Sequence, residues 1–370
     1  MKPRLVISGV NLTEAGPLSV FKDALSSLVR LYADRYEIVA LVHSRSLFEL
    51  QDVTYLEFPK TKLSWWRRLR FEYWTCRALS EKLRPHLWLA MHDITPNVRA
   101  RVRAVYCHNA SPFYRFTATD AMLDWRFGLF TLFYRFLYKI NIRKNAFVVV
   151  QQEWLRSEFK QRYQVSSVVV AHPSIEHIAV MDAKVQSHDC TVRRFFFPAY
   201  PRIFKNVELI LQATRILARR GVCNFEIWLT LAGNENPYAQ KLFSAYRDLC
   251  EVKWLGLLTR AEVFQRYAEA DCLIFPSKLE TWGMPISEFR QTGKPMLIAD
   301  LPYAHETVGE YGAVRFFQPD CPDELAVIME RFMDNDLQME RLEAISIASP
   351  FAENWDALFA ILLGEVEGGT

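Results

Sequence analysis

Short apolar runs alternate with amphipathic segments along the first half of the chain. The apolar runs predict buried strands over residues 4–9, 36–43, 53–58, 87–92, 102–107, 145–151 and 167–171. The spacing of apolar positions between these runs predicts helices over residues 18–32, 65–83 and 153–163. A long aromatic stretch fills residues 121–139. Strands and helices that alternate in this way are typical of a parallel sheet with helices on both faces.

The pattern is lost over residues 173–190, which are polar and predict a linker, and it then restarts. Strands are predicted over residues 194–198, 226–232, 252–255, 271–277, 295–300 and 314–316. Helices are predicted over residues 207–219, 237–249, 260–270, 285–292, 322–334 and 351–363. This repeated architecture predicts an α/β protein with two doubly wound, Rossmann-like domains, residues 1–175 and 190–345, facing each other across a cleft.

Composition narrows the class of protein without naming a function. With 370 residues, 51% of them apolar and 24% charged, the chain is long enough for two globular cores. A net charge of +3 is too small to indicate a nucleic-acid-binding protein. Seven scattered cysteines without C-x-x-C spacing indicate reduced thiols. The N-terminus lacks the apolar segment of a signal peptide, and no stretch reaches the roughly 18 apolar residues of a membrane span, so we expect a cytoplasmic protein.

Two glutamates mark a candidate site in the second half. Glu280 lies in a loop after the strand predicted at residues 271–277, and Glu288 lies in the first turns of the following short helix. Pro285 at the start and Gly293 just past the end punctuate that helix. Ligands bind to open α/β sheets at the carboxyl ends of parallel strands. Carboxylates accept hydrogen bonds from hydroxyls, and free N–H groups at a helix start bind phosphates. The segment therefore predicts a pocket for a sugar joined to a phosphate.

Three motifs between residues 194 and 334 carry a family resemblance. The first is the block FPSKLETWGMPISE at residues 275–288, which holds Glu280 and Glu288 with seven residues between them. The second is PAYPRIFKN at residues 198–206, and the third is VKWLG at residues 252–256 followed by RAE at residues 260–262. In this order the motifs resemble the nucleotide-binding half of family 4 glycosyltransferases, which are retaining enzymes of the two-Rossmann GT-B fold. The resemblance also implies that residues 346–370 form a helix that crosses back to the N-terminal domain.

The resemblance implies a role for each charged residue of these motifs. Glu288 would accept the ribose hydroxyls of a nucleotide sugar, and Glu280 would contact the transferred sugar. Arg202 and Lys205 would stabilise the charge of the departing diphosphate without a metal ion or other cofactor, opposite the N–H groups of Gly283 and Met284. No covalent intermediate with a protein nucleophile is implied. The alternative for these side chains is that they are ordinary solvated charges beside helix starts.

Further residues are expected around the donor. Backbone around Thr281 and Trp282 would contact the sugar, and the strand-end loops near Asn234 and Leu255 would hold the base. In the N-terminal domain the candidates are Gly16, His108 and its competitor His92, with a structural role as the alternative for both histidines. Asn206 stands where the family more commonly has glycine. The triplet DND at residues 334–336 resembles a metal-binding motif but is expected to be a helix-end turn.

The acceptor is expected to be a saccharide or a polyprenyl-diphosphate-linked saccharide of a bacterial surface polysaccharide. Residues 62–77 combine five basic residues with three tryptophans, and aromatic and basic residues recur over 113–144. Such a helix can lie on the anionic inner face of the cytoplasmic membrane, or its aromatics can be core. Two other functions are compatible with the sequence. One is another nucleotide-sugar enzyme with two Rossmann-like domains, such as an epimerase or a phosphorylase-like enzyme. The other is a non-catalytic binding subunit. The absence of G-x-G-x-x-G after any strand disfavours a nicotinamide dehydrogenase.

Overall fold

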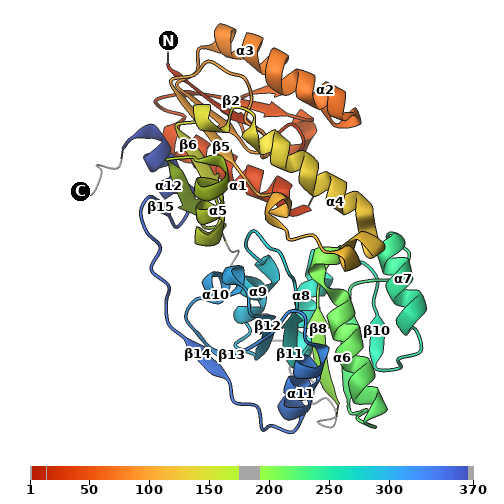
Figure 1. Ribbon diagram of the computed structural model, residues 1–370. Coiled ribbons are helices and arrows are strands. Elements are labelled where there is room, and N and C mark those ends of the chain that lie inside the picture. The colour runs from red at the N-terminus through yellow and green to blue at the C-terminus, as the bar shows by residue number, and fades with distance from the viewer. Residues whose placement is uncertain (1, 14, 175–191, 366–370) are drawn as a thin grey trace. The chain divides into compact units, whose positions relative to one another are not determined.

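The chain forms two compact units, each built around one sheet (Figure 1). The computed structural model describes residues 2–13, 15–174 and 192–365. Unit 1 comprises Met1–Tyr114, Phe130–Ser174 and Ile347–Thr370, and unit 2 comprises Arg115–Leu129 and Ile175–Ser346. Residues 115–129 thus group with the second unit, although the sequence pattern places them in the first domain. Most of the predicted linker, residues 175–190, lies outside the described residues.

Unit 1 contains an eight-stranded sheet in the order β15-β7-β6-β5-β4-β1-β2-β3. Its strands are β1 (Arg4–Ser8), β2 (Glu37–Val42), β3 (Val53–Glu57), β4 (Leu87–Ala90), β5 (Val102–Tyr106), β6 (Phe147–Val150), β7 (Val168–Ala171) and β15 (Phe351–Ala352). Every neighbouring pair runs parallel. Because successive strands add outward from β1 on one side and from β4 on the other, the order reverses between β1 and β4. That reversal is the point where doubly wound sheets open a crevice.

The helices of unit 1 differ from the predicted ones mainly in detail. They are α1 (Ala15–Tyr32), α2 (Trp65–Arg70), α3 (Cys76–Leu83), α5 (Glu153–Tyr163), α12 (Trp355–Leu363) and the second half of α4 (Ala118–Lys139). A π-helical turn, Phe71–Thr75, joins α2 to α3, so the helix predicted over 65–83 is one run with a local widening. Helix α4 was not predicted; it contains the aromatic stretch at residues 121–139 and is kinked at Asp124, where φ is −154° and ψ is 85°.

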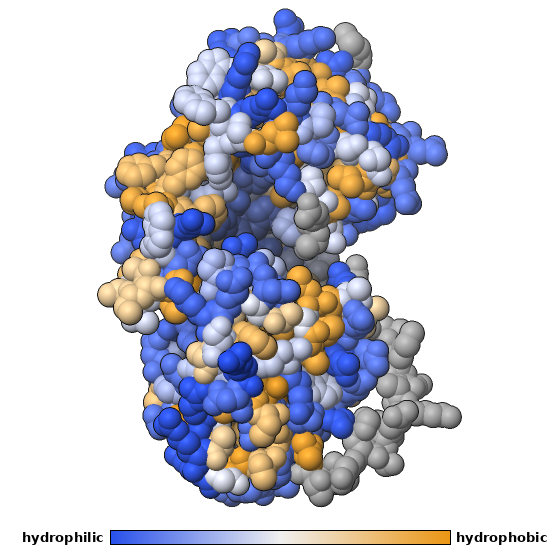
Figure 2. All heavy atoms as spheres, turned by 90° about the vertical axis from the view of Figure 1, so that its right-hand side faces the viewer, coloured by the Kyte–Doolittle hydropathy of each residue, from blue (hydrophilic) through white to orange (hydrophobic). Residues whose placement is uncertain are grey.

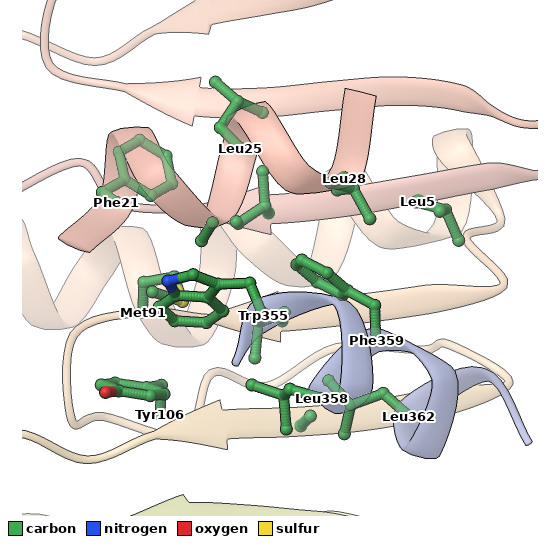
Figure 3. Packing of buried hydrophobic residues seen from close by; sticks show 14 of the residues in the cluster. Leu5, Phe21, Leu25, Leu28, Met91, Tyr106, Trp355, Leu358, Phe359 and Leu362 are labelled. Atoms are coloured by element: carbon green, nitrogen blue, oxygen red, sulfur yellow. The ribbon is translucent and has the colours of Figure 1, made fainter. Parts of the chain in front are cut away.

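The C-terminal segment completes the core of unit 1. The helix predicted over 351–363 begins at Trp355, because Phe351 and Ala352 instead pair with Val170 and Ala171 as strand β15. The apolar face of α12 packs into the same buried cluster as β1 and α1 (Figure 3). The cluster includes Leu5, Phe21, Leu25, Leu28, Met91, Tyr106, Trp355, Leu358, Phe359 and Leu362. The predicted crossing of the C-terminal helix to the N-terminal domain is therefore confirmed.

Unit 2 contains a seven-stranded sheet in the order β10-β9-β8-β11-β12-β13-β14. Its strands are β8 (Arg193–Phe197), β9 (Phe225–Leu229), β10 (Val252–Trp254), β11 (Cys272–Phe275), β12 (Met296–Ala299), β13 (Tyr311–Phe317) and β14 (Glu340–Leu342). All pairs are parallel except β13 with β14. The order reverses between β8 and β11, which gives unit 2 its own crevice at the carboxyl ends of these two strands.

Six helices beside this sheet belong wholly to unit 2. They are α6 (Val207–Arg219), α7 (Pro237–Tyr246), α8 (Arg260–Glu269), α9 (Met284–Arg290), α10 (Pro302–Val308) and α11 (Pro322–Met333). Helix α10 and strand β14 were not predicted, because each is too short to show a clear period in the sequence. The described part of the chain contains no helix that is long and apolar enough to cross a bilayer.

Candidate functional site

The fold brings two of the sequence motifs together at the strand reversal of unit 2. Strands β8 and β11 are parallel neighbours, with Phe196 beside Leu273. Their carboxyl ends lead into the loops that carry Lys205 and Glu280, so residues 75 positions apart meet at one sheet edge. Lys205 Nζ lies 2.5 Å from Glu280 Oε1, and their side chains are 17% and 13% exposed. A charged pair that is shielded yet still open to solvent can exchange partners with a ligand.

The turn that presents Lys205 depends on the asparagine that follows it. Ile203–Lys205 forms a single 3₁₀ turn, and Asn206 closes it with φ of 55°. Asparagine tolerates this left-handed conformation better than most residues, so it can replace glycine here. Its side-chain amide donates to the carbonyls of Pro276 at 3.1 Å and Pro319 at 2.7 Å. The departure at Asn206 therefore keeps the turn and ties it to the loop after β11.

Glu288 occupies a second polar centre nearby on helix α9. Its side chain is 14% exposed, and Arg260 Nη2 lies 3.5 Å from its Oε1. Tyr267, which is buried, donates its hydroxyl to Glu288 Oε2 at 3.1 Å. Burial and the charge of Glu288 raise the pKa of Tyr267 well above its ordinary value, so the hydroxyl stays protonated and acts as a donor. Arg260 belongs to the third sequence motif, so that motif supplies a charged partner for Glu288.

The loop between the two glutamates is fixed by buried hydrogen bonds. Gly283 caps α9 with φ of 91°, a conformation in which other residues are strained. Trp282 is buried and donates from Nε1 to Ser287 Oγ at 2.9 Å. Thr307 Oγ1 donates to the carbonyl of Trp282, and Tyr303 donates to the carbonyl of Ser277 at 2.7 Å. Tyr303 and Thr307 both lie on α10, and neither was predicted to support the site. Pro302, a residue that favours the first position of a helix, was the one sign of this helix in the sequence.

The remaining predicted residues of unit 2 lie at the same carboxyl edge of the sheet. Arg202 follows β8, is exposed, and places its guanidinium 5.1 Å from the ring centre of Tyr200. Asn234 is exposed in the loop after β9. Leu255, half-buried after β10, donates its N–H to Leu229 at 2.9 Å. Thr281 and Met284 are half-buried in the loop and at the first position of α9.

Gly16 and His108 belong to unit 1. Gly16 is exposed in the first turn of α1. His108 is half-buried after β5, and its N–H donates to Asp93 Oδ1 at 2.8 Å. Asp93 has φ of 70° and also accepts from the N–H of Asn109 and the hydroxyl of Tyr138, at 2.9 and 3.0 Å. This buried carboxylate, which sequence reasoning named only as the neighbour of His92, fixes the backbone that carries His108.

The reversal point of unit 1 is filled by a buried polar cluster. Arg68 Nε lies 2.8 Å from Glu72 Oε1, and Glu72 Oε1 lies 3.5 Å from His92 Nε2. Ser8 Oγ lies 3.2 Å from the same nitrogen of His92. Burial raises the pKa of Glu72 to about 7, against the lowering effect of Arg68. Burial and the charges of Arg68 and His108 hold the pKa of His92 well below its ordinary value. The competing candidate His92 is thus a packed, neutral core histidine.

Among the described residues, no group of three or more His, Cys, Asp or Glu side chains could hold a metal ion. In the triplet at residues 334–336, Asp336 pairs with Arg331 at 3.3 Å, and Asn335 has φ of 57° and accepts from Arg193 at 2.6 Å. The triplet therefore forms the helix-end turn that the sequence predicts.

Comparison with known proteins finds similarity mainly in the second half of the chain. Residues 185–348 match the model of the family described as glycosyl transferases group 1. The O-antigen chain mannosyltransferase RfbU of Salmonella typhimurium is 22% identical over 254 residues, which are 64% of this chain and 63% of that protein. The O-antigen chain mannosyltransferase B of Escherichia coli is 24% identical over 153 residues, 41% of this chain and 40% of that protein. The chain thus spans less than two thirds of the length of these curated relatives.

Solved structures extend the likeness to nearly the whole fold. A sucrose-phosphate synthase from Thermosynechococcus elongatus matches with a TM-score of 0.63 at 12% identity, covering 90% of each chain. The lipopolysaccharide outer core galactosyltransferase WaaB matches with a TM-score of 0.62 at 13% identity, covering 99% of this chain and 100% of that one. At such identities the likeness concerns the fold, and together with the two parallel sheets it confirms the predicted pair of Rossmann-like domains.

Proposed function

We propose that the protein is a retaining glycosyltransferase that uses a nucleotide-sugar donor, because residues 185–348 match the model of the glycosyl transferases group 1 family. The observation that carries the proposal is the Lys205–Glu280 pair at the strand reversal of unit 2. The likeness to two O-antigen mannosyltransferases supports a role in the synthesis of a bacterial surface polysaccharide. The acceptor we propose is a saccharide, in its free or polyprenyl-diphosphate-linked form.

Transfer would depend on charge placed where the leaving group departs. The bond between the anomeric carbon and the diphosphate oxygen breaks, and a bond from that carbon to an acceptor hydroxyl oxygen forms on the same face. The hydroxyl proton leaves with the departing diphosphate. Lys205, and Arg202 at the outer side of the same loop, would stabilise the growing negative charge more in the transition state than in the ground state. Glu280 would exchange part of its contact with Lys205 for hydroxyls of the transferred sugar.

Glu288 would hold the nucleoside end of the donor. Its carboxylate accepts from Tyr267 and faces Arg260, and a carboxylate can accept several hydrogen bonds, which suits ribose hydroxyls. Asn234 and Leu255, on neighbouring strand ends, are the proposed surroundings of the base, and Gly16 and His108 of unit 1 are proposed to contribute to the phosphate and the reacting sugar. Since Lys205 and Arg202 supply positive charge, we propose that transfer needs no divalent metal, and an excess of EDTA should leave the rate unchanged.

The chain keeps both members of the charged pair, which favours a transferase over a subunit that only binds nucleotide sugar. A binding subunit would not need a fixed cation facing the departing diphosphate, because that charge matters only when the bond breaks. An epimerase or a phosphorylase-like enzyme of the same fold is the other candidate. It would release or isomerise the sugar without an acceptor hydroxyl, so the products separate the two activities.

Two helices of unit 1 form an exposed aromatic surface that we propose rests on an anionic membrane. Helix α2 and the turn after it expose Trp66 by 80% and Trp74 by 64%, and α4 exposes Phe136 by 59%. Trp65 joins the helices, with its ring 4.9 Å from that of Phe133. Figure 2 views the molecule from the side where α2 and α4 lie in Figure 1 and shows apolar side chains gathered in patches.

Exposed basic residues flank these aromatic residues in the sequence, namely Lys62, Arg67, Arg70, Lys139, Arg143 and Lys144. Exposed aromatic rings with cations beside them suit the headgroup region of anionic lipid. We therefore propose that the protein works at the inner face of the cytoplasmic membrane. Arg68 and Glu72 are not part of this aromatic surface, because their side chains are buried.

Flotation with phosphatidylglycerol vesicles tests this surface. The wild-type protein should float at low salt and less at high salt, and Trp66→Ala combined with Phe136→Ala should reduce the bound fraction. Leu257→Ala is the matched control, because Leu257 is 62% exposed in unit 2, outside the aromatic surface. Absence of binding at low salt would contradict membrane contact and leave the transferase proposal standing.

A thermal-shift panel of UDP, GDP, dTDP and ADP, followed by transfer assays with the matching nucleotide sugars, tests the function itself. One nucleoside diphosphate should raise the melting temperature in a concentration-dependent way, since a ligand bound by the folded state stabilises it. Its sugar conjugate should then release that nucleotide when a saccharide acceptor is present. No shift with any of the four nucleotides would contradict the proposed donor site.

A further inference from the structure

Residues 115–129 are separated from the rest of unit 2 by the 45 residues 130–174, yet they group with it. They include the first half of α4, and two contacts attach them. Lys241 Nζ on α7 donates to the carbonyl of Met122 at 2.8 Å. The ring of Phe127 lies 5.4 Å, centre to centre, from the ring of Phe204. The segment therefore packs against the 3₁₀ turn Ile203–Lys205, which presents the lysine of the candidate site.

Phe204, like Asn206, joins this turn to the loop after β11. Its carbonyl accepts the N–H of Lys278 at 2.7 Å and the hydroxyl of Ser277 at 3.2 Å. Its ring centre lies 5.7 Å from Lys205 Nζ, and the ring of Phe275 lies 5.6 Å from the same nitrogen. Two aromatic rings within this distance attract an ammonium group and restrict where it rests. The position of Phe204 thus influences both the backbone and the charged end of Lys205.

Phe127 is itself held in place by the kink of α4. At the kink, Asp124 Oδ1 accepts the N–H of Arg126 at 3.1 Å and that of Phe127 at 3.3 Å. The ring of Phe116 lies 6.4 Å from the ring of Phe127 and packs onto Gly128, where a Cβ atom would come within 2.9 Å of it. The lack of a side chain at Gly128 lets Phe116 pack close to the helix. The ring of Phe127 therefore contacts the ring of Phe116 as well as that of Phe204.

We propose that Phe127 is a positioning residue for Lys205. It holds the ring of Phe204, and through it the turn Ile203–Lys205, in the geometry that transfer requires. A residue from the first half of the chain would thus serve the charged pair of unit 2. The inference rests on the proposed function, since it assigns Phe127 a part in the reaction that Lys205 is proposed to assist. Displacements of about 1 Å at a catalytic group can cost on the order of 10²-fold in rate.

Three variants test this role. The assay measures nucleoside diphosphate released in the presence of acceptor, with the nucleotide sugar that the thermal-shift panel selects as donor. Phe127→Ala should lower kcat by on the order of 10-fold with little change in KM for the donor, because the lysine acts mainly in the transition state. Phe127→Leu, which retains apolar volume, should recover part of the loss. Trp125→Ala is the matched control, because Trp125 lies two residues earlier on the same helix and is 59% exposed; it should match the wild type.

A double-mutant cycle separates positioning from general support of the fold. In a Lys205→Ala background, Phe127→Ala should cause little further loss, because its effect acts through the missing ammonium group. An equal fold-loss in both backgrounds, or wild-type kcat in Phe127→Ala, would overturn the inference. If Phe127→Ala does not fold, Phe127→Leu carries the same cycle. Wild-type activity in Lys205→Ala alone would instead refute the proposed function.

Discussion

The two sheets reverse their strand order in the same way, but different side chains fill the two reversal points. In unit 1 the side chains of Arg68, Glu72 and His92 are 6%, 0% and 3% exposed and pair with one another. In unit 2 the side chains of Lys205 and Glu280 are 17% and 13% exposed and form one ion pair. The charged side chains at the reversal point of unit 1 are thus fully buried, whereas those at the reversal point of unit 2 keep partial contact with solvent.

This difference separates a structural network from a binding site. Charges that are fully removed from water need all their partners inside the protein, and losing one partner is costly. The buried cluster under α2 therefore suits a fixed role in holding the ends of β1 and β4. A pair that keeps contact with solvent can exchange one partner for a ligand at lower cost. This contrast supports our proposal that the chemistry of the donor takes place in unit 2.

Removing Glu280 should give the largest effect on activity after the loss of Lys205 itself. Glu280→Ala should lower turnover by on the order of 10²-fold or more, since the variant removes a contact to the transferred sugar and leaves Lys205 without its partner. Turnover is measured as nucleoside diphosphate released in the presence of acceptor. Circular dichroism should show an intact fold. Wild-type turnover would mean that the open reversal point is not the donor site.

Removing Glu288 should affect binding more than turnover. Glu288→Ala deletes the proposed acceptor of the ribose hydroxyls, and charged hydrogen bonds of this kind contribute about 1.5–3 kcal/mol. The dissociation constant of the nucleoside diphosphate should therefore rise by roughly 10-fold or more, as calorimetry would measure. Asp300→Ala is a suitable control, because Asp300 pairs with His305 on the surface of the same unit. Equal nucleotide affinity in Glu288→Ala and the control would contradict the role of Glu288.

Replacing Arg202 should cost less than replacing Lys205. Arg202 is exposed and rests beside Tyr200, so water weakens its interaction with a diphosphate. Arg202→Ala should reduce turnover by on the order of 10-fold or less. A loss as large as that of Glu280→Ala would show that Arg202 moves inward when the donor binds.

The buried cluster of unit 1 should respond to pH in its stability. The pKa of Glu72 is raised from 4.5 in a free side chain to about 7 in the fold. Between these values the unfolded chain releases the proton while the folded protein keeps it, so this stabilising contribution is complete below pH 4.5 and is lost as pH rises to about 7. Glu72→Gln replaces the titrating carboxyl group with a neutral amide, so the variant does not lose this stability as pH rises. The stability of the variant relative to the wild type should thus increase from pH 5 to pH 8, by on the order of 1–3 kcal/mol.

Thermal denaturation of both proteins across this range checks the effect. His92 is present in both, so its own titration does not distinguish them. A stability difference that stays constant between pH 5 and pH 8 would show that Glu72 is ionised in the folded protein, and the two reversal points would then differ less than their burial indicates.

The strand ends were predictable from the sequence, but much of their surroundings was not. Apolar runs predicted β8 and β11, the strand-end rule predicted a ligand pocket around Glu280, and the family resemblance implied that Lys205 acts at the same site. The burial of Arg68 and Glu72 was not predictable, because a basic, tryptophan-rich segment looks like a solvated face until His92, twenty residues later, is placed beneath it.

The supports of the site came from segments that local patterns describe poorly. Helix α10 has only seven residues, so its Tyr303 and Thr307 gave no clear period, yet both anchor the loop around Trp282. Phe127 lay in an aromatic stretch to which no helix or strand was assigned, and nothing in its neighbours indicated a partner 77 positions away at Phe204. Such contacts depend on tertiary packing, which overrides local preference.

The most direct test of the open reversal point compares Lys205→Ala with Arg220→Ala. Arg220 lies at the opposite end of α6 and forms an exposed ion pair with Glu330, so it serves as a matched loss of one cation. With the nucleotide sugar selected by the panel and a saccharide acceptor, Lys205→Ala should release nucleoside diphosphate at least on the order of 10²-fold more slowly than Arg220→Ala, which should match the wild type. Equal rates in the two variants would contradict the assignment of the donor chemistry to this pair.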